Sequence, residues 1–158
     1  MLDKIHPMSS CDDARIRAFG VTLEALTRLN HVFDRSLREQ AGLGQGWFEA
    51  LLRVERSGGA MTMGTLAEQV ALTSGGVTRL VDRLVEVGFA ERRNCATDRR
   101  VQYVAITDAG RSALGSALEI HLVDLQREFI GRVSPEELAV VVAVMDRLRA
   151  PIEELATN

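Results

Sequence analysis

A short segment that alternates apolar and polar residues interrupts a chain whose other periodic segments are helical. Residues 89–94 (FAERRN) and 101–107 (VQYVAIT) both alternate at a period of two, and a polar connection joins them. This arrangement predicts two β-strands that form a hairpin. On either side of it, apolar residues recur at spacings of three and four, which predicts amphipathic helices. The chain therefore belongs to the mainly α (α+β) class, with one hairpin set among helices.

The segments before the hairpin predict one long helix followed by three short ones. The long helix carries a stripe at alternating spacings of four and three, made of Phe19, Leu23, Leu26, Asn30, Phe33 and Leu37. Residues 47–56, 63–71 and 73–88 then predict three short helices, which glycine residues separate or terminate.

Two further helices are predicted after the hairpin. Thr107 and Asp108 are suited to cap a helix that runs to about Ile130, and Ser134 with Pro135 suits the start of the last helix. The last helix repeats apolar residues at spacings of three and four: Leu138, Val141, Met145, Leu148, Ile152 and Leu155. We favour a dimer interface for this stripe, because symmetric pairing is the commonest assembly, over an internal core.

The order helix, helix, helix, hairpin between long amphipathic helices predicts a winged helix-turn-helix within a helical dimerisation frame. We assign residues 46–106 to the winged DNA-binding lobe and residues 11–41 and 107–157 to the dimerisation helices, all within one domain of residues 1–158. In such a lobe the second helix of the helix-turn-helix lies in the major groove. Double-stranded DNA is therefore the expected partner.

The helix expected in the major groove begins at Ser74. Gly75 and Gly76 would allow its first turn to approach the DNA backbone closely. Short or forked donors that reach phosphates and bases lie near its start, namely Ser74, Thr78 and Arg79. Arg83 lies one turn further along, where we expect it to bind a phosphate.

The segment LTSGGVTRLVDRLVEVGFAERRNCATDRRVQYVAITDAGRSAL closely resembles the MarR family of bacterial transcriptional regulators. A recognition helix, then G-F-x-E-R, then D-R-R in the wing, then I-T-D-A-G at the next helix occur in the family's order and spacing. The resemblance implies a homodimer whose terminal helices interlock, with its two winged lobes on a palindromic operator. It also implies a small-molecule or redox signal that weakens DNA binding.

The wing concentrates positive charge in a chain whose net charge is −3. Arginine is favoured in the minor groove because the narrow groove concentrates negative potential. By analogy with the family's D-x-R pattern, we expect Arg100 to enter that groove, with Arg99 as the second candidate and Asp98 bracing a neighbouring guanidinium. Two arginines at the base of the wing would bind phosphates or tie the wing to the body: Arg92 and Arg93.

Two residues are candidates for contact with an effector. The family's pocket lies between the first, second and fifth helices, and Trp47 would face that region, although a core position is the commoner one for tryptophan. His121 lies within an apolar stripe, either as a hydrogen-bonded core histidine or as a ligand or metal contact with Asp124 one turn on.

Cys11 and Cys95 match neither a disulfide framework nor a paired metal motif, so we expect free thiols and favour inert ones over a thiol sensor. Phosphate-binding, zinc-protease and nucleophile-elbow motifs do not occur, so we expect no enzyme, no catalytic residue, no cofactor and no metal. The longest apolar run, residues 138–145, is far shorter than the roughly 20 residues that cross a bilayer. We expect a cytoplasmic protein that does not enter a membrane.

The sequence thus favours a sequence-specific DNA-binding regulator, most simply a repressor that a small-molecule effector releases. A redox- or zinc-responsive regulator is one alternative. A helical protein-interaction module of the same fold, whose DNA-binding face has decayed, is another. Arg79, Asp98 and Arg100 favour DNA binding, because a decayed face would have no reason to keep them.

Overall fold

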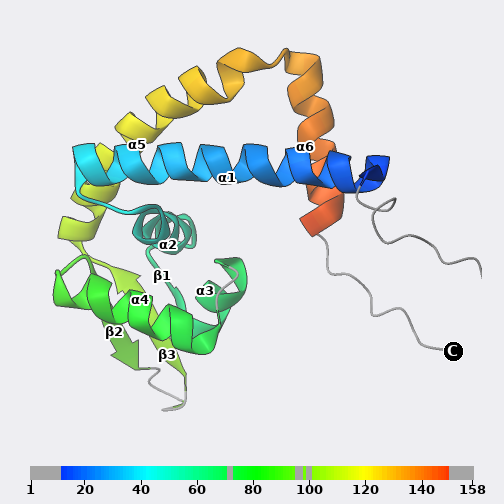
Figure 1. Cartoon of the computed structure of the whole chain (residues 1–158). Helices are drawn as coiled ribbons and strands as arrows, with labels where there is room; N and C mark the ends of the chain where they lie inside the picture. Colours follow the sequence, from blue (N-terminus) through cyan, green and yellow to red (C-terminus); the bar gives the residue numbers. More distant parts are fainter. Residues whose placement is uncertain (1–11, 71–72, 95–97, 99–100, 150–158) are drawn as a thin grey trace, which may run out of the picture. The chain divides into compact units, whose positions relative to one another are not determined.

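The computed structural model describes residues 12–70, 73–94, 98 and 101–149, which form two compact units. The first unit ends at His121 and the second begins at Leu122. The first unit follows the order α1 (Ala14–Ala41), α2 (Gln45–Arg56), β1 (Ala60–Thr62), α3 (Met63–Gln69), α4 (Ser74–Glu86), β2 (Ala90–Asn94), β3 (Gln102–Ile106) and α5 (Asp108–Glu128), whose last turns belong to the second unit (Figure 1).

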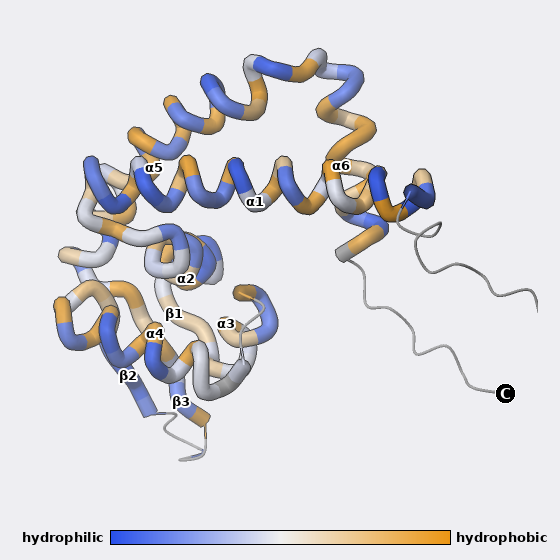
Figure 2. Tube along the Cα trace, viewed as in Figure 1, coloured by the Kyte–Doolittle hydropathy of each residue, from blue (hydrophilic) through white to orange (hydrophobic). Residues whose placement is uncertain are grey.

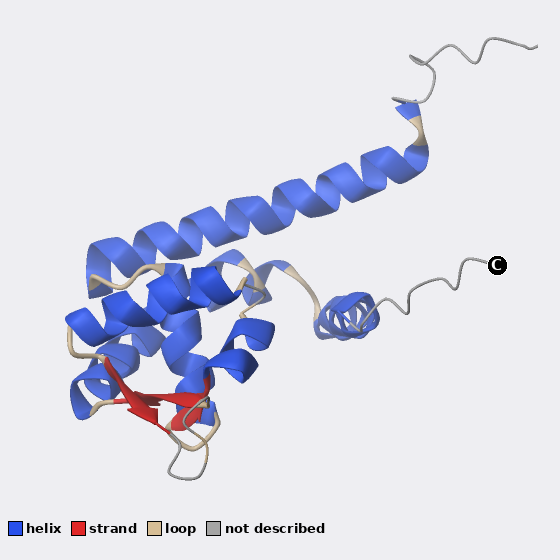
Figure 3. Cartoon of the chain, turned by 90° about the horizontal axis from the view of Figure 1, so that it is seen from below, coloured by secondary structure: helices blue, strands red, loops and turns tan. Residues whose placement is uncertain are grey.

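Three antiparallel strands form a small sheet in the order β1-β3-β2. Strands β2 and β3 are the predicted hairpin, paired from Ala90 with Ile106 to Asn94 with Gln102. Strand β1 covers the other edge of β3 and was not expected from the sequence, because three residues are too few to show a period of two. The two views place the strands on the side of the lobe away from α1 (Figures 1 and 3). This arrangement confirms the predicted winged helix-turn-helix.

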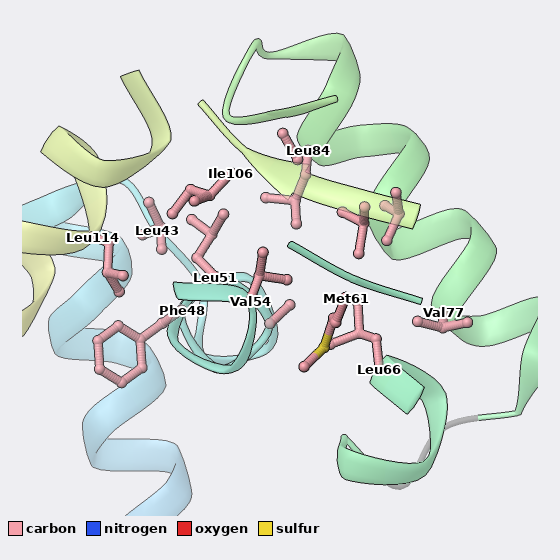
Figure 4. Packing of buried hydrophobic residues seen from close by; sticks show 14 of the residues in the cluster. Leu43, Phe48, Leu51, Val54, Met61, Leu66, Val77, Leu84, Ile106 and Leu114 are labelled. Carbon is pink, nitrogen blue, oxygen red and sulfur yellow. The ribbon is translucent and has the colours of Figure 1, made fainter. Parts of the chain in front are cut away.

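The hydrophobic core of the first unit is built around α2 (Figure 4). Phe48, Leu51 and Val54 lie on one face of this helix and are almost completely buried. The other helices and the sheet contribute further buried side chains to the same cluster, among them Leu37, Leu43, Leu66, Val77, Val81, Leu84, Val104, Ile106 and Leu114. Each large apolar side chain buried in this way contributes about 1.5–3 kcal/mol to folding. The core therefore fixes which face of each short helix is left outside.

Threonine side chains set the starts of the helices in the lobe. The Thr73 hydroxyl accepts a hydrogen bond from the backbone N–H of Gly76 at 3.2 Å, so α4 starts at Ser74 as predicted. Thr62 caps α3 in the same way, and Thr107 accepts from the N–H of Gly110 at the start of α5. These bonds satisfy amide groups that the first turn of a helix leaves without an intrahelical partner.

The apolar stripe of α1 divides into two parts. Phe33 and Leu37 are buried in the core, whereas Phe19, Leu23 and Leu26 are between 46% and 68% exposed. Figure 2 shows apolar positions recurring along the whole of this helix. Only the C-terminal part of the predicted stripe therefore serves the core of its own lobe.

The second unit contains the end of α5, a short 3-10 helix η2 (Ile130–Arg132) and α6 (Pro135–Arg149). The hydroxyl of Ser134 accepts a hydrogen bond from the backbone N–H of Glu137, and the carboxylate of Glu137 accepts one from the backbone N–H of Ser134. This reciprocal pair fixes the start of α6 where it was predicted. Leu148 is 67% exposed, and the predicted continuation of the stripe through Ile152 and Leu155 lies outside the described residues. Over the described ranges, no helix combines the length and the apolar character needed to span a membrane.

Candidate nucleic-acid interface

Helix α4 turns an apolar face to the core and an arginine-bearing face outward. Val77, Val81 and Leu84 are at most 2% exposed, and they lie on one side of the helix. The helical period places Arg79 and Arg83 away from these residues, and both are exposed. Within the part of the chain that the structure describes, neither guanidinium has a carboxylate partner. Both arginines are thus available to an external anion.

The first turn of α4 also lies at the surface. A Cβ atom added at Gly75 would meet no atom within 4 Å, so packing inside the chain does not require glycine there. The N–H of Gly76 is bonded to Thr73, which leaves it unavailable to a phosphate. Thr78 is exposed, and the side chain of Ser74 lies outside the described residues.

Arg92 connects the wing to α4. Its Nη2 lies 2.7 Å from Oδ1 of Asp82 and donates to the backbone carbonyl of Thr78 at 3.4 Å. Of the two roles predicted for the arginines at the wing base, Arg92 therefore fits the one that ties the wing to the body. Arg93 pairs instead with Glu91 of the same strand. The sequence alone does not indicate a role for Asp82, because helical periodicity does not reveal a partner on the strand that follows.

The tip of the wing lies largely outside the described residues, and so do both candidate thiols. Arg99, Arg100, Cys95 and Cys11 all fall in this category. Asp98 is exposed, and its carbonyl accepts a hydrogen bond from the N–H of Val101 at 3.0 Å. The minor-groove contact of the wing stays a prediction.

The I-T-D-A-G segment holds the root of the wing. The hydroxyl of Thr107 donates to the carbonyl of Gly88 at 2.6 Å while accepting from Gly110, so the start of α5 is fastened to the turn between α4 and β2. A Cβ atom on Gly110 would lie 2.0 Å from the carbonyl oxygen of Phe89. Gly110 therefore permits a close backbone approach that no other residue allows.

Trp47 lines a cleft of about 410 Å³ between the end of α1, the start of α2 and α4. Its indole ring packs edge-on against the ring of Phe89, with centroids 6.4 Å apart. Of the two positions considered for Trp47, the core position fits better, because the side chain packs against the hydrophobic core and its cleft is lined by α4 rather than α5. The neighbouring Phe48 takes the inward position on α2, where it is 1% exposed.

His121 packs against two aromatic rings. Its imidazole lies 5.0 Å from the ring of Phe33 and 4.8 Å from that of Phe48, measured between centroids, as suits a core histidine. Asp124 is buried and forms an ion pair with Arg127 at 2.7 Å. Among the residues that the structure describes, no three His, Cys, Asp or Glu side chains gather closely enough to hold a metal ion. The structure does not bring Trp47 and His121 to a common cleft.

A helix-turn-helix with a β-hairpin wing, whose exposed helix face carries arginine, defines the class of winged-helix DNA-binding proteins. A model of the MarR family matches residues 41–101. The transcriptional regulator YkoM of Bacillus subtilis is 28% identical over 117 residues, which are 73% of this chain and 75% of that protein. The chain therefore matches the MarR family over its winged helix-turn-helix lobe and is similar to DNA-binding transcriptional regulators, which are not enzymes.

Two solved structures have the same fold. The MarR-family regulator Sco3205 of Streptomyces coelicolor, solved in complex with DNA, is 25% identical, has a TM-score of 0.82 and matches over 86% of both chains. BpsR of Bordetella bronchiseptica, whose DNA binding is regulated by 6-hydroxynicotinic acid, has a TM-score of 0.73 at 20% identity. That match covers 84% of this chain and 98% of BpsR.

Proposed function

We propose that this protein is a homodimeric repressor that binds a palindromic operator and is released by a small-molecule effector. The observation that carries the proposal is the outward face of α4. Its core-facing residues hold the helix firmly, while Arg79 and Arg83 extend from the opposite side without carboxylate partners in the described part of the chain. Sco3205, which was solved in complex with DNA, shares this fold.

Each predicted contact has its own task on the DNA. Arg79 reads a guanine edge in the major groove, and Arg83 binds a phosphate one turn further along. Ser74, Gly75, Gly76 and Thr78 lie where the first turns of α4 approach the backbone. In the wing, the proposal assigns the minor groove to Arg100 or Arg99, braced by Asp98, and a phosphate to Arg93.

The exposed part of the α1 stripe supports the dimer. Phe19 and Leu23 are 68% and 54% exposed, which is unusual for large apolar side chains that follow a helical period. The exposed apolar residues of α6, including Leu148, offer a second surface of the same kind. A two-fold axis would present two recognition helices to the two half-sites of a palindrome.

In this proposal the dimer has one conformation that binds DNA and another that does not. An effector that binds the second conformation more tightly shifts the dimer toward it and so lowers the affinity for DNA. The size of this decrease is set by the coupling free energy between effector and DNA. The regulation of BpsR by 6-hydroxynicotinic acid supports this arrangement for a protein of the same fold. No described residue favours the zinc alternative, and the redox alternative rests on cysteines outside the described ranges.

The test compares Arg79→Ala with Arg100→Ala on an operator taken from the DNA upstream of the coding region and on a random duplex. Arg79→Ala should weaken operator binding more than random binding, by about 1–3 kcal/mol of discrimination. Arg100→Ala should weaken both and lower the slope of log affinity against log salt by about one. If neither variant changes any affinity, the DNA-reading roles are wrong. A wild-type protein without operator preference would instead favour the interaction module.

A further inference from the structure

The cleft beside Trp47 is cationic. Its walls include three arginines from two helices, Arg38 of α1 and Arg79 and Arg83 of α4, and it has no carboxylate among its described lining residues. Trp47 and Leu80 supply an apolar floor. Three guanidinium groups in a lining without a described carboxylate favour a negatively charged ligand. The cleft therefore suits an anion.

Arg38 is held in place at one edge of its guanidinium. Its Nε donates to Oδ2 of Asp34 at 2.8 Å, while Oδ1 of the same carboxylate accepts the backbone N–H of Gln45 at 2.8 Å. Over the described ranges, the terminal Nη1 and Nη2 groups have no hydrogen-bond acceptor. Both terminal NH2 groups, which form a rigid planar fork, thus remain for a ligand.

The guanidinium of Arg38 also lies directly over Gly44. A Cβ atom at Gly44 would be 2.7 Å from Nη2 and 2.8 Å from Cζ. The backbone of Gly44 has φ −71° and ψ 155°, which alanine adopts without strain. The absence of a side chain at this position is therefore what leaves room for Arg38.

We propose that Arg38 is a further DNA-binding residue, which together with Arg83 holds a backbone phosphate in this cleft. The inference rests on the proposed function and extends the DNA-binding surface from α4 to the end of α1. A phosphate of the duplex is the occupant the cleft fits, because Arg79 and Arg83 continue directly onto the outward face of α4. A forked guanidinium binds two phosphate oxygens at once. The contact carries no base information, so it strengthens binding to every sequence.

Three variants test the role of Arg38. Arg38→Gln removes the charge, Gly44→Ala keeps the charge but displaces the guanidinium, and Arg28→Gln removes an exposed arginine of the same helix as a control. Affinities for the operator and for a random duplex are measured at several salt concentrations, well below the melting temperature of each variant. Arg38→Gln should weaken both affinities by roughly three- to tenfold and lower the salt slope by about one. Gly44→Ala should reproduce much of this loss with no change in net charge.

The inference would be overturned if Arg38→Gln and Gly44→Ala had the same DNA affinities and salt slopes as the wild type. It would also be overturned if Arg28→Gln lost as much DNA affinity as Arg38→Gln. If Arg79→Ala still loses operator preference in that case, the proposed function stands without this contact. A further experiment titrates the protein with inorganic phosphate and follows tryptophan fluorescence. Trp47 is the chain's one tryptophan, so its fluorescence reports on the cleft. A fluorescence response to phosphate alone, with DNA affinity unchanged in Arg38→Gln, would assign the cleft to a free anion and reject the DNA contact.

Discussion

Gly110 and Gly115 lie five residues apart in α5, yet a methyl group would meet very different surroundings at the two positions. At Gly110 it would collide with the carbonyl oxygen of Phe89 and approach Cγ1 of Ile106 to 2.9 Å. At Gly115 it would meet no atom within 4 Å. Of these two glycines in α5, only Gly110 is needed for the close packing at the root of the wing.

Gly110→Ala should destabilise the protein by about 1–3 kcal/mol or more, because backbone atoms rather than a flexible side chain would have to move. Gly115→Ala is the matched control and should be neutral or stabilising by up to about 1 kcal/mol, since alanine is the better helix former. Urea denaturation followed by circular dichroism measures both changes. A denaturation midpoint of Gly110→Ala at or above that of the wild type would contradict the close approach.

At the scale of elements, Asp34 joins the end of α1 to the start of α2. Its hydrogen bond with Arg38, and then the one from the N–H of Gln45, hold the pKa of this carboxyl below its ordinary value of 3.8. A carboxyl whose pKa is lower in the folded than in the unfolded state stabilises the fold above the unfolded pKa. That contribution is lost as the pH falls below about 4 toward the folded pKa.

Asp34→Asn should therefore lower the free energy of unfolding at pH 7 by about 0.5–1 kcal/mol, a small value because a third of the side chain is exposed. The difference from the wild type should shrink as the pH falls from 5 to about 3. Glu39→Gln, which removes an exposed carboxylate from the same helix, should show little change at either pH. A pH-independent difference for Asp34→Asn would show that the ionised carboxylate does not link the two helices.

Periodicity predicted the helices, the hairpin and the outward placement of Arg79 and Arg83, because each depends on residues close together in the sequence. The pair of Arg92 with Asp82 and the position of Arg38 over Gly44 were not predicted. These contacts depend on how separate elements pack, which periodicity does not encode. Strand β1 was also not predicted, because its three residues are too few to show a period and it forms only by pairing with β3.

At the scale of the whole molecule, α1 divides its apolar residues between the core and the surface. Phe19 and Val21 are both 68% exposed, and positions two residues apart face nearly opposite sides of a helix. Phe19 continues the stripe that ends in the core, whereas Val21 does not belong to it. The two residues therefore form a matched pair for testing the proposed dimer.

Phe19→Glu should weaken the dimer by several kcal/mol, because a charge would be buried in the interface, while Val21→Glu should leave it intact. Both side chains are exposed within the chain, so both variants should keep the folded lobe. Light scattering across a dilution series distinguishes a dimer from a monomer of 17.3 kDa. Equal dissociation of the two variants would exclude a specific role for this stripe in the dimer.

The two faces of α4 have an evolutionary consequence. The buried residues Val77, Val81 and Leu84 stabilise the helix, whereas Arg79 and Arg83, which would contact DNA, are exposed. Exposed positions of this kind accept substitution at a cost within about 0.5 kcal/mol. After gene duplication, one copy could therefore change the DNA sequence that it binds through substitutions on this face alone. Each step toward the new specificity would leave the stability of the fold nearly unchanged.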